Sequence, residues 1–192
     1  MSVLRALEAP AHLTGIVERL RRITVEVHGA DGGGAGILWA PDLVVTNAHV
    51  ARALQLHVTF VDDGGAEAHV VALDRRADLA LLRVPRRGIA PATVADSDRL
   101  RIGALVVALG HPLGLRRTLT AGVIHALAPV APGGRRWIHA DVRLAPGNSG
   151  GPLADTAGDV VGINTMVAGG LALAIPADDV RRFVRLALAR RV

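Results

Sequence analysis

The 192-residue chain is 51% hydrophobic and 20% charged, a balance typical of a folded domain with a sizeable core and not of a disordered chain. It contains no cysteine, which excludes a disulfide framework, a thiolate metal site and a cysteine nucleophile. Its formal net charge of +5 comes from arginines in scattered pairs without interleaved aromatics, so the composition does not favour a nucleic-acid-binding face.

The chain shows no targeting or membrane-spanning pattern. Residues 1–29 lack the continuous apolar run and small-residue cleavage site of a signal peptide. No stretch approaches the roughly 20 apolar residues that a membrane span needs. We therefore expect a cytoplasmic protein without a membrane span.

The first half of the chain begins with helical spacing and then turns to short β-rich runs. The segment LTGIVERLRR predicts a helix over residues 13–22. Alternating and β-branched runs then predict six strands. These strands cover residues 23–27, 36–39, 43–46, 56–61, 68–74 and 79–84. The charged segment PRRGIAP at 85–91 ends this set.

A second set of strands follows and leads to a final helix. The predicted strands cover residues 105–110, 119–127, 137–142, 159–167 and 171–175. A helix over residues 176–191 opens with Pro and two Asp and ends among arginines, as the helix dipole favours. Short strands at this spacing are typical of barrels or a sandwich, and we predict two β-barrels of similar size.

The stretch APGNSGGP at 145–152 places Ser149 in a turn too rich in glycine for regular structure. Such a turn can aim the backbone N–H groups of Gly147 and Ser149 at one point, where they would stabilise an oxyanion. The alternative is an ordinary glycine turn. A nucleophilic serine also requires a base and a carboxylate that orients it.

Two residues at strand ends fit those roles. His49 follows the β-branched run LVVT, and Asp78 directly precedes the apolar run LALLRV. Taken singly, the histidine also fits a structural role and the aspartate a turn or cap. Together with Ser149 they make up the residue types of a Ser-His-Asp triad.

At this point the sequence resembles the trypsin-like serine proteases and, within them, the HtrA/Deg type. The resemblance runs from about residue 23 to 183 in the family's order. It is carried by TNAHV (46–50), ADLALLRV (77–84), GHPLG (110–114), APGNSGGPL (145–153), VVGINT (160–165) and LAIP (173–176). The joint occurrence of these motifs makes the resemblance specific.

The resemblance implies an all-β fold of two six-stranded antiparallel β-barrels, the trypsin-like double barrel, with short N-terminal and C-terminal helices. We expect an N-terminal helical segment over 1–22, a first barrel over 23–96 with His49 and Asp78, a second barrel over 97–176 with Ser149, and a C-terminal helix over 177–192. The pattern covers a protease domain without a PDZ module.

The resemblance also implies residue roles for an acyl-enzyme mechanism without cofactor or metal. His49 would be the general base, Asp78 its orienting carboxylate and Ser149 the nucleophile, with the N–H groups of Gly147 and Ser149 as the oxyanion hole. Thr165 would lie behind the aspartate. Met166 and Val167 would pair with substrate backbone as an added strand.

The specificity pocket departs from the family pattern. Ala172 stands where the family has glycine and would narrow the pocket, and Leu144 would line it, which favours Val, Ala or Leu before the scissile bond. Arg143 would favour Asp or Glu if its side chain pointed inward. Strand alternation favours an outward side chain, which would be surface only.

We expect a serine endopeptidase that cleaves unfolded or flexible protein segments in protein quality control. The alternative is a catalytically resting protease-fold chaperone that binds unfolded chains, and a weaker one is nucleic-acid binding by the arginines. Family trimers form through N-terminal aromatic residues, which the first 36 residues here lack. We therefore expect a monomer or a small homo-oligomer, with polypeptide and no nucleic acid as its partner.

Overall fold

Two helices and twelve strands make up most of the residues that the computed structural model describes, namely 3–30, 32–53, 55–62, 64–85, 88–111 and 118–189. Side chains are described from residue 13 onward. Residues 112–114 of the GHPLG motif and the end of the predicted C-terminal helix, from residue 190, lie outside the described residues.

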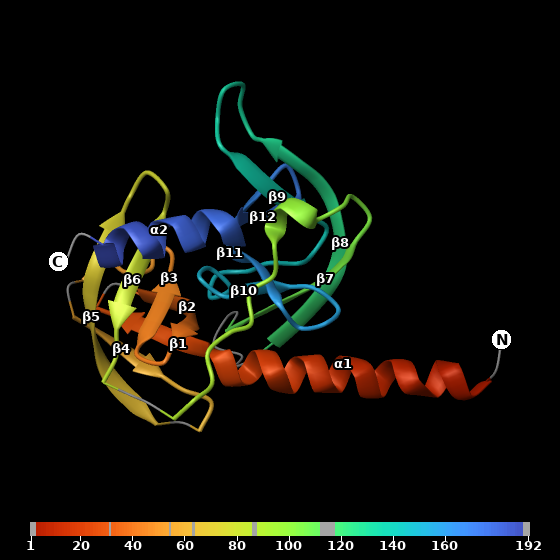
Figure 1. Ribbon diagram of the computed structural model, residues 1–192, viewed down its shortest axis with the longest axis horizontal. Helices are drawn as coiled ribbons and strands as arrows, with labels where there is room; N and C mark the ends of the chain where they lie inside the picture. Colours follow the sequence, from red (N-terminus) through yellow and green to blue (C-terminus); the bar gives the residue numbers. More distant parts are fainter. Residues whose placement is uncertain are drawn as a thin grey trace.

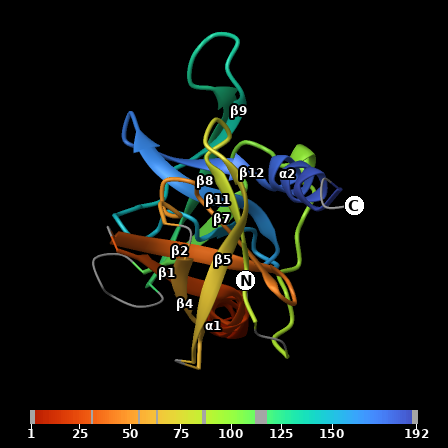
Figure 2. The ribbon, with the colours of Figure 1, turned by 90° about the vertical axis from the view of Figure 1, so that its left-hand side faces the viewer.

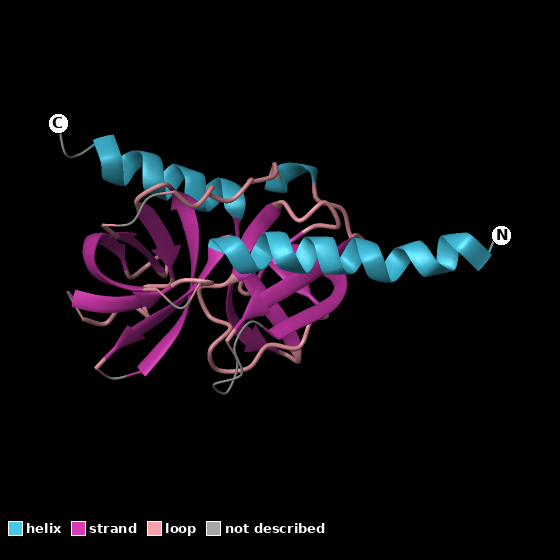
Figure 3. Cartoon of the chain, turned by 90° about the horizontal axis from the view of Figure 1, so that it is seen from below, coloured by secondary structure: helices cyan, strands magenta, loops and turns pink. Residues whose placement is uncertain are grey.

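The strands form two closed antiparallel barrels of six strands each, which confirms the predicted fold (Figure 3). The first barrel has the order β1-β2-β3-β6-β5-β4. Its strands are β1 (Thr24–Gly29), β2 (Gly32–Ala40), β3 (Leu43–Thr46), β4 (Gln55–Thr59), β5 (Gly65–Asp74) and β6 (Leu79–Arg83). The second has the order β10-β11-β12-β9-β8-β7. Its strands are β7 (Leu105–Gly110), β8 (Thr118–Pro129), β9 (Arg136–Ala140), β10 (Pro152–Ala154), β11 (Val160–Ala168) and β12 (Leu171–Pro176).

Three groups of buried aliphatic side chains hold this arrangement together. One fills the first barrel around Val27, Val58 and Leu82, and another fills the second around Ile124 and Leu153. The third lies between the barrels and the two helices. It joins Leu20, Ile37, Leu109, Ile163 and Val180 among others. The position of one barrel on the other is therefore fixed by burial of apolar surface.

The N-terminal helix α1 (Val3–Ile23) begins earlier than the predicted residue 13. Pro10 lies inside this helix, although proline in a helix interior removes a hydrogen bond. The helix runs along one side of the molecule and its N-terminal end extends beyond the barrels (Figure 1). Its C-terminal part is anchored to the second barrel, since Arg19 donates to the Ala157 carbonyl at 2.6 Å and pairs with Asp159 at 3.1 Å.

The C-terminal helix α2 (Ala177–Ala189) is tied to the connection between the barrels. That connection contains the 3-10 helix η1 (Ser97–Arg99). The backbone N–H and the hydroxyl of Ser97 donate to Asp178 at 2.8 and 2.7 Å, and Arg181 donates to the same carboxylate at 2.6 Å. Burial alone would raise the pKa of Asp178, but these hydrogen bonds from Ser97 and Arg181 outweigh it, and the pKa lies below its ordinary value.

Replacing Asp178 by Ala should lower the free energy of unfolding by about 1–2 kcal/mol at neutral pH, because α2 loses a first-turn carboxylate and Ser97 its acceptor. A carboxyl with a lowered folded-state pKa stabilises the fold above its ordinary value of 3.8 and loses that effect as pH falls through the folded-state pKa. Urea unfolding at pH 7 and near pH 2.5 should therefore show a smaller difference between the wild type and the variant at the lower pH. Asp179→Ala, in the same turn, is the matched control, and an equal loss at both pH values would contradict the assignment.

Candidate active site

The loop that carries Ser149 is hydrogen bonded to both barrels. Ala35, in β2 of the first barrel, donates its N–H to the Ser149 carbonyl at 2.8 Å. On the other side, Gly150 donates to the carbonyl of Asn164 in β11 at 2.8 Å, and Asn164 donates to the Gly151 carbonyl at 2.9 Å. The position of Ser149 is therefore set by the junction of the barrels.

Glycine is required at two positions of this loop. Gly150 has a φ of +86°, and a Cβ atom there would overlap the Ala35 carbonyl oxygen and the Thr46 hydroxyl. Gly147 has a φ of +104°, in the region that L side chains rarely adopt. Side chains at these positions would strain the loop or push the barrels apart.

The backbone N–H groups of Gly147 and Ser149 donate to no group among the described residues. Around them the loop is fixed, because His111 donates to the Gly147 carbonyl at 3.1 Å and Asn148 donates to the Ala145 carbonyl at 3.0 Å. Gly147 and Ser149 line a cavity of about 200 Å³ together with His49. Free donors beside a nucleophile are suited to a developing oxyanion.

His49 and Asp78, 29 residues apart, lie in direct contact. The His49 ring Nδ1 lies 2.8 Å from one carboxylate oxygen of Asp78 and 3.1 Å from the other. The His49 backbone N–H also donates to Asp78 at 3.0 Å. The carboxylate thus orients the ring and favours the tautomer with the proton on Nδ1, which leaves Nε2 as a base.

The turn before β6 presents Asp78 in an unusual backbone conformation. Asp78 has a φ of +53° and is the only non-glycine residue of the described chain with a positive φ. Asp74 shapes this turn by accepting the N–H groups of Arg76 and Ala77 at 3.0 and 2.8 Å. Aspartate tolerates the left-handed region better than most residues, at a cost of roughly 1 kcal/mol.

Arg135, at the end of the β8–β9 hairpin, holds the same turn from the second barrel. This hairpin rises away from the barrels in Figure 2. The Nη1 of Arg135 donates to the Ala77 carbonyl at 2.6 Å, and the Arg135 guanidinium lies over the Trp137 ring at 3.8 Å from the ring centroid. Burial lowers the pKa of Arg135, and the charges of Asp179, Asp78 and Asp74 counteract the shift.

Asn47 links the Asp78 turn to β11 inside the molecule. Its buried side-chain amide donates to the Asp78 carbonyl at 3.0 Å and to the Thr165 hydroxyl at 3.1 Å. The Thr165 hydroxyl donates in turn to the Ile163 carbonyl at 3.2 Å. Thr165 is therefore linked to Asp78 through Asn47. The bond from Asn47 is to the backbone carbonyl of Asp78 and not to its carboxylate.

The Ser149 hydroxyl donates to the Thr165 carbonyl at 2.9 Å. Within the described chain no hydrogen bond joins this hydroxyl to the His49 ring. Rotation about the Ser149 side chain would be needed to bring the hydroxyl toward Nε2 of His49. The arrangement is that of a serine at rest beside an oriented histidine.

The predicted substrate-binding residues divide into two groups. Leu144, Thr165, Met166 and Val167 line a cavity of about 310 Å³ with Ser149. Met166 and Val167 are 46% and 52% exposed. β11 pairs with β10 only from Val160 to Ile163. The residues after this segment pair with β12 on one side, and no strand among the described residues pairs with their other edge.

Arg143 and Ala172 lie outside that cavity. Arg143 is exposed, and its carbonyl accepts the Thr120 hydroxyl at 3.1 Å. Ala172 is 2% exposed and belongs to the core of the second barrel, against which Leu144 also packs. Leu144 therefore connects this core to the cavity beside Ser149.

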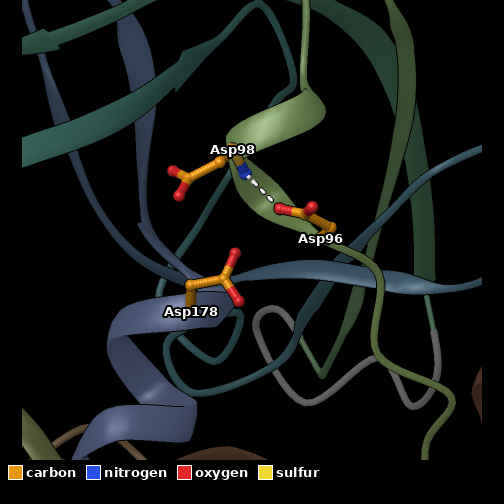
Figure 4. Close-up of side chains that lie close together, drawn as sticks. All are labelled: Asp96, Asp98 and Asp178. Atoms are coloured by element: carbon orange, nitrogen blue, oxygen red, sulfur yellow. Dashed lines mark hydrogen bonds between the residues drawn. The ribbon is translucent and has the colours of Figure 1, made fainter.

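Three aspartates, Asp96, Asp98 and Asp178, place carboxylate oxygens within 4.8 Å of one another (Figure 4). Their charges are already balanced by Arg99 at 3.3 Å from Asp96, by Arg136 beside Asp98 and by Arg181 at 2.6 Å from Asp178. Asp178 also accepts the two hydrogen bonds from Ser97 described above. These acids anchor η1 to α2, and we assign them no metal.

Comparison with known proteins agrees with the fold and the motifs. Residues 34–163 match the family model of the trypsin-like peptidase domain. The chain is 38% identical over 186 residues to Protease Do-like 1, chloroplastic, of Arabidopsis thaliana, covering 88% of this chain and 42% of the relative. It is 36% identical over 148 residues to a probable periplasmic serine endoprotease DegP-like of Chlamydia pneumoniae, covering 71% of this chain and 29% of the relative.

A solved structure of the HtrA-type protease AlgW with a tripeptide superposes with a TM-score of 0.84 at 28% identity, covering 90% of this chain and 62% of that one. The chain spans less than half the length of the two curated relatives, the chloroplastic and the periplasmic protease. It belongs to the trypsin-like peptidases, and the relatives described above are named as a Do-like protease, a DegP-like serine endoprotease and an HtrA-type protease.

The expectation of a cytoplasmic location is wrong, because the relatives are named as chloroplastic and periplasmic proteins. A targeting segment is separate from the folded domain and is removed on delivery, so the residues of the domain itself carry no mark of the compartment. None of the described helices combines the length and apolarity needed to cross a bilayer.

Asn47→Ala should lower the free energy of unfolding by about 2 kcal/mol, because two buried hydrogen bonds lose their donor. It should also slow labelling of Ser149 by a fluorophosphonate roughly tenfold to hundredfold, since the Asp78 turn is no longer held to β11. Labelling rates by gel fluorescence and urea unfolding measure the two effects. Thr24→Val, which removes a buried bond of 2.7 Å to the Leu20 carbonyl, is the control and should lower stability only. Equal labelling rates in the two variants would refute a role for Asn47 at the site.

Proposed function

We propose that this chain is a serine endopeptidase that hydrolyses peptide bonds in unfolded or flexible polypeptide segments. The observation that carries the proposal is the His49 ring held by Asp78 at 2.8 Å, lining one cavity with Ser149 and the free N–H groups. This geometry supports acyl transfer with neither metal nor cofactor.

In the proposed reaction, Ser149 attacks the peptide carbonyl while His49 Nε2 takes the hydroxyl proton. The N–H groups of Gly147 and Ser149 stabilise the oxyanion, each by about 3 kcal/mol if well aimed. His49 then gives its proton to the leaving amine as the C–N bond breaks. Water, deprotonated by His49, hydrolyses the acyl-enzyme and restores Ser149.

The open edge of β11 is the proposed binding surface for substrate backbone. An extended segment adds to such an edge by main-chain hydrogen bonds, which suits flexible chains of varied sequence. The solved structures of AlgW with a tripeptide and a decapeptide show that this HtrA-type protease binds peptides. The aliphatic Leu144 in the 310 Å³ cavity favours Val, Ala or Leu before the scissile bond, and the core behind Leu144 includes Ala172.

We infer a role in protein quality control, with unfolded polypeptide and not nucleic acid as partner, and a monomer or small homo-oligomer as the working form. A second function is favoured by the bond from the Ser149 hydroxyl to the Thr165 carbonyl. A protein that keeps this rotamer would bind unfolded chains as a resting chaperone without cleaving them.

Ser149→Ala should lower peptide hydrolysis by roughly 10⁶, because the triad acts as a unit. Fluorophosphonate labelling followed by mass spectrometry should place the adduct on Ser149 of the wild type and find none in the variant. Both proteins should bind an unfolded chain with similar affinity. A folded wild type that binds such chains but neither takes up the probe nor cleaves would replace the endopeptidase with the resting chaperone.

A further inference from the structure

The two cavities at Ser149 lie on different sides of the reacting serine. The 310 Å³ cavity lies toward β11 and is lined by Leu144 and Met166. The 200 Å³ cavity is lined by His49 and by residues of the β1–β2 hairpin. His49 delivers its proton to the leaving amine. Substrate residues after the scissile bond therefore lie on the His49 side, in the 200 Å³ cavity.

Among the described residues that line that cavity, Arg52 carries a permanent positive charge. It follows His49 in the same turn, where its N–H donates to the Val50 carbonyl at 3.1 Å. Its Nε donates to the His49 carbonyl at 2.8 Å, which holds the exposed side chain against the cavity. A guanidinium fixed in this way loses little freedom when it binds a ligand.

The terminal nitrogens of Arg52 make no hydrogen bond or ion pair with any described residue. Some other arginines of the described chain are paired, for example Arg19 with Asp159, Arg83 with Asp42 and Arg181 with Asp178. The rest of the cavity wall is formed by small or uncharged residues, mainly Gly29, Gly33, Val50 and Pro146. None of the described residues of this wall satisfies the guanidinium fork, whose geometry matches a carboxylate.

We propose that Arg52 is a specificity-determining residue that binds a carboxylate on the leaving-group side of the scissile bond. The carboxylate comes from Asp or Glu at the first or second residue after the bond, or from a free C-terminus at that distance. The inference rests on the proposed endopeptidase function and adds a preference that the β11 side does not provide.

The test uses internally quenched peptides with Val before the scissile bond and either Glu or Gln at the two positions after it. The wild type should cleave the Glu peptide with a kcat/KM roughly fivefold to tenfold higher, as for a charge-assisted pair in a partly exposed site. Arg52→Gln should bring the ratio to about one, and Arg52→Glu should favour a Lys peptide. A second pair of peptides ends two residues after the scissile bond, one with a free C-terminal carboxylate and one with an amidated C-terminus. Comparing these two peptides shows whether Arg52 binds a C-terminal carboxylate or a side-chain carboxylate.

Arg101→Gln is the matched control, because exposed Arg101 also donates to backbone carbonyls, those of Arg99 and Leu100, and lines neither cavity at Ser149. It should leave the ratio unchanged. If Arg52→Gln slows the Glu and Gln peptides equally, Arg52 only supports His49 and the proposal is overturned. A wild-type ratio near one for both peptide pairs overturns it as well, with the endopeptidase function intact. Absence of both cleavage and fluorophosphonate labelling overturns the two proposals together.

Discussion

The hydrogen bonds that hold the Ser149 loop between β2 and β11 are the constraint on which the site depends. Ala35 binds one side of the loop and Asn164 the other, at 2.8 Å each. Gly150 permits this approach because any side chain there would collide with the Ala35 carbonyl. Ser149 is therefore placed by both barrels at once, and movement of one barrel against the other would displace it from His49.

The same junction fixes the histidine and the aspartate. His49 and Asp78 come from the first barrel, but the Asp78 turn is held by Arg135 and, through Asn47, by Thr165, both from the second. The aliphatic core between the barrels and helices supplies the stabilisation that these polar contacts alone would not provide. Changes in that core should thus affect catalysis before they unfold either barrel.

Local patterns in the sequence predicted what local physics decides. Period-2 alternation and β-branched runs placed β3 and β7 at the bounds observed, whereas β10, with three residues, is too short to show a period. Motifs marked His49, Asp78 and Ser149 as candidate site residues, and the fold places His49 against Asp78 and in one cavity with Ser149. The resemblance placed Thr165 behind the aspartate but did not show that Asn47 joins them. The contacts of Asn47 with Thr165, and of Arg135 with Ala77, join residues 118 and 58 positions apart, and no local pattern pairs residues so distant. Only the folded chain shows them.

Under the proposed function, the bond from the Ser149 hydroxyl to the Thr165 carbonyl would connect substrate binding to the rotamer of Ser149. Thr165 lies at the start of the open edge of β11, where an extended substrate would seek acceptors for its own N–H groups. A substrate N–H that takes the Thr165 carbonyl would compete with the serine hydroxyl for it. In the proposed mechanism the released hydroxyl would turn toward Nε2 of His49, so an occupied β11 edge would favour the reactive rotamer.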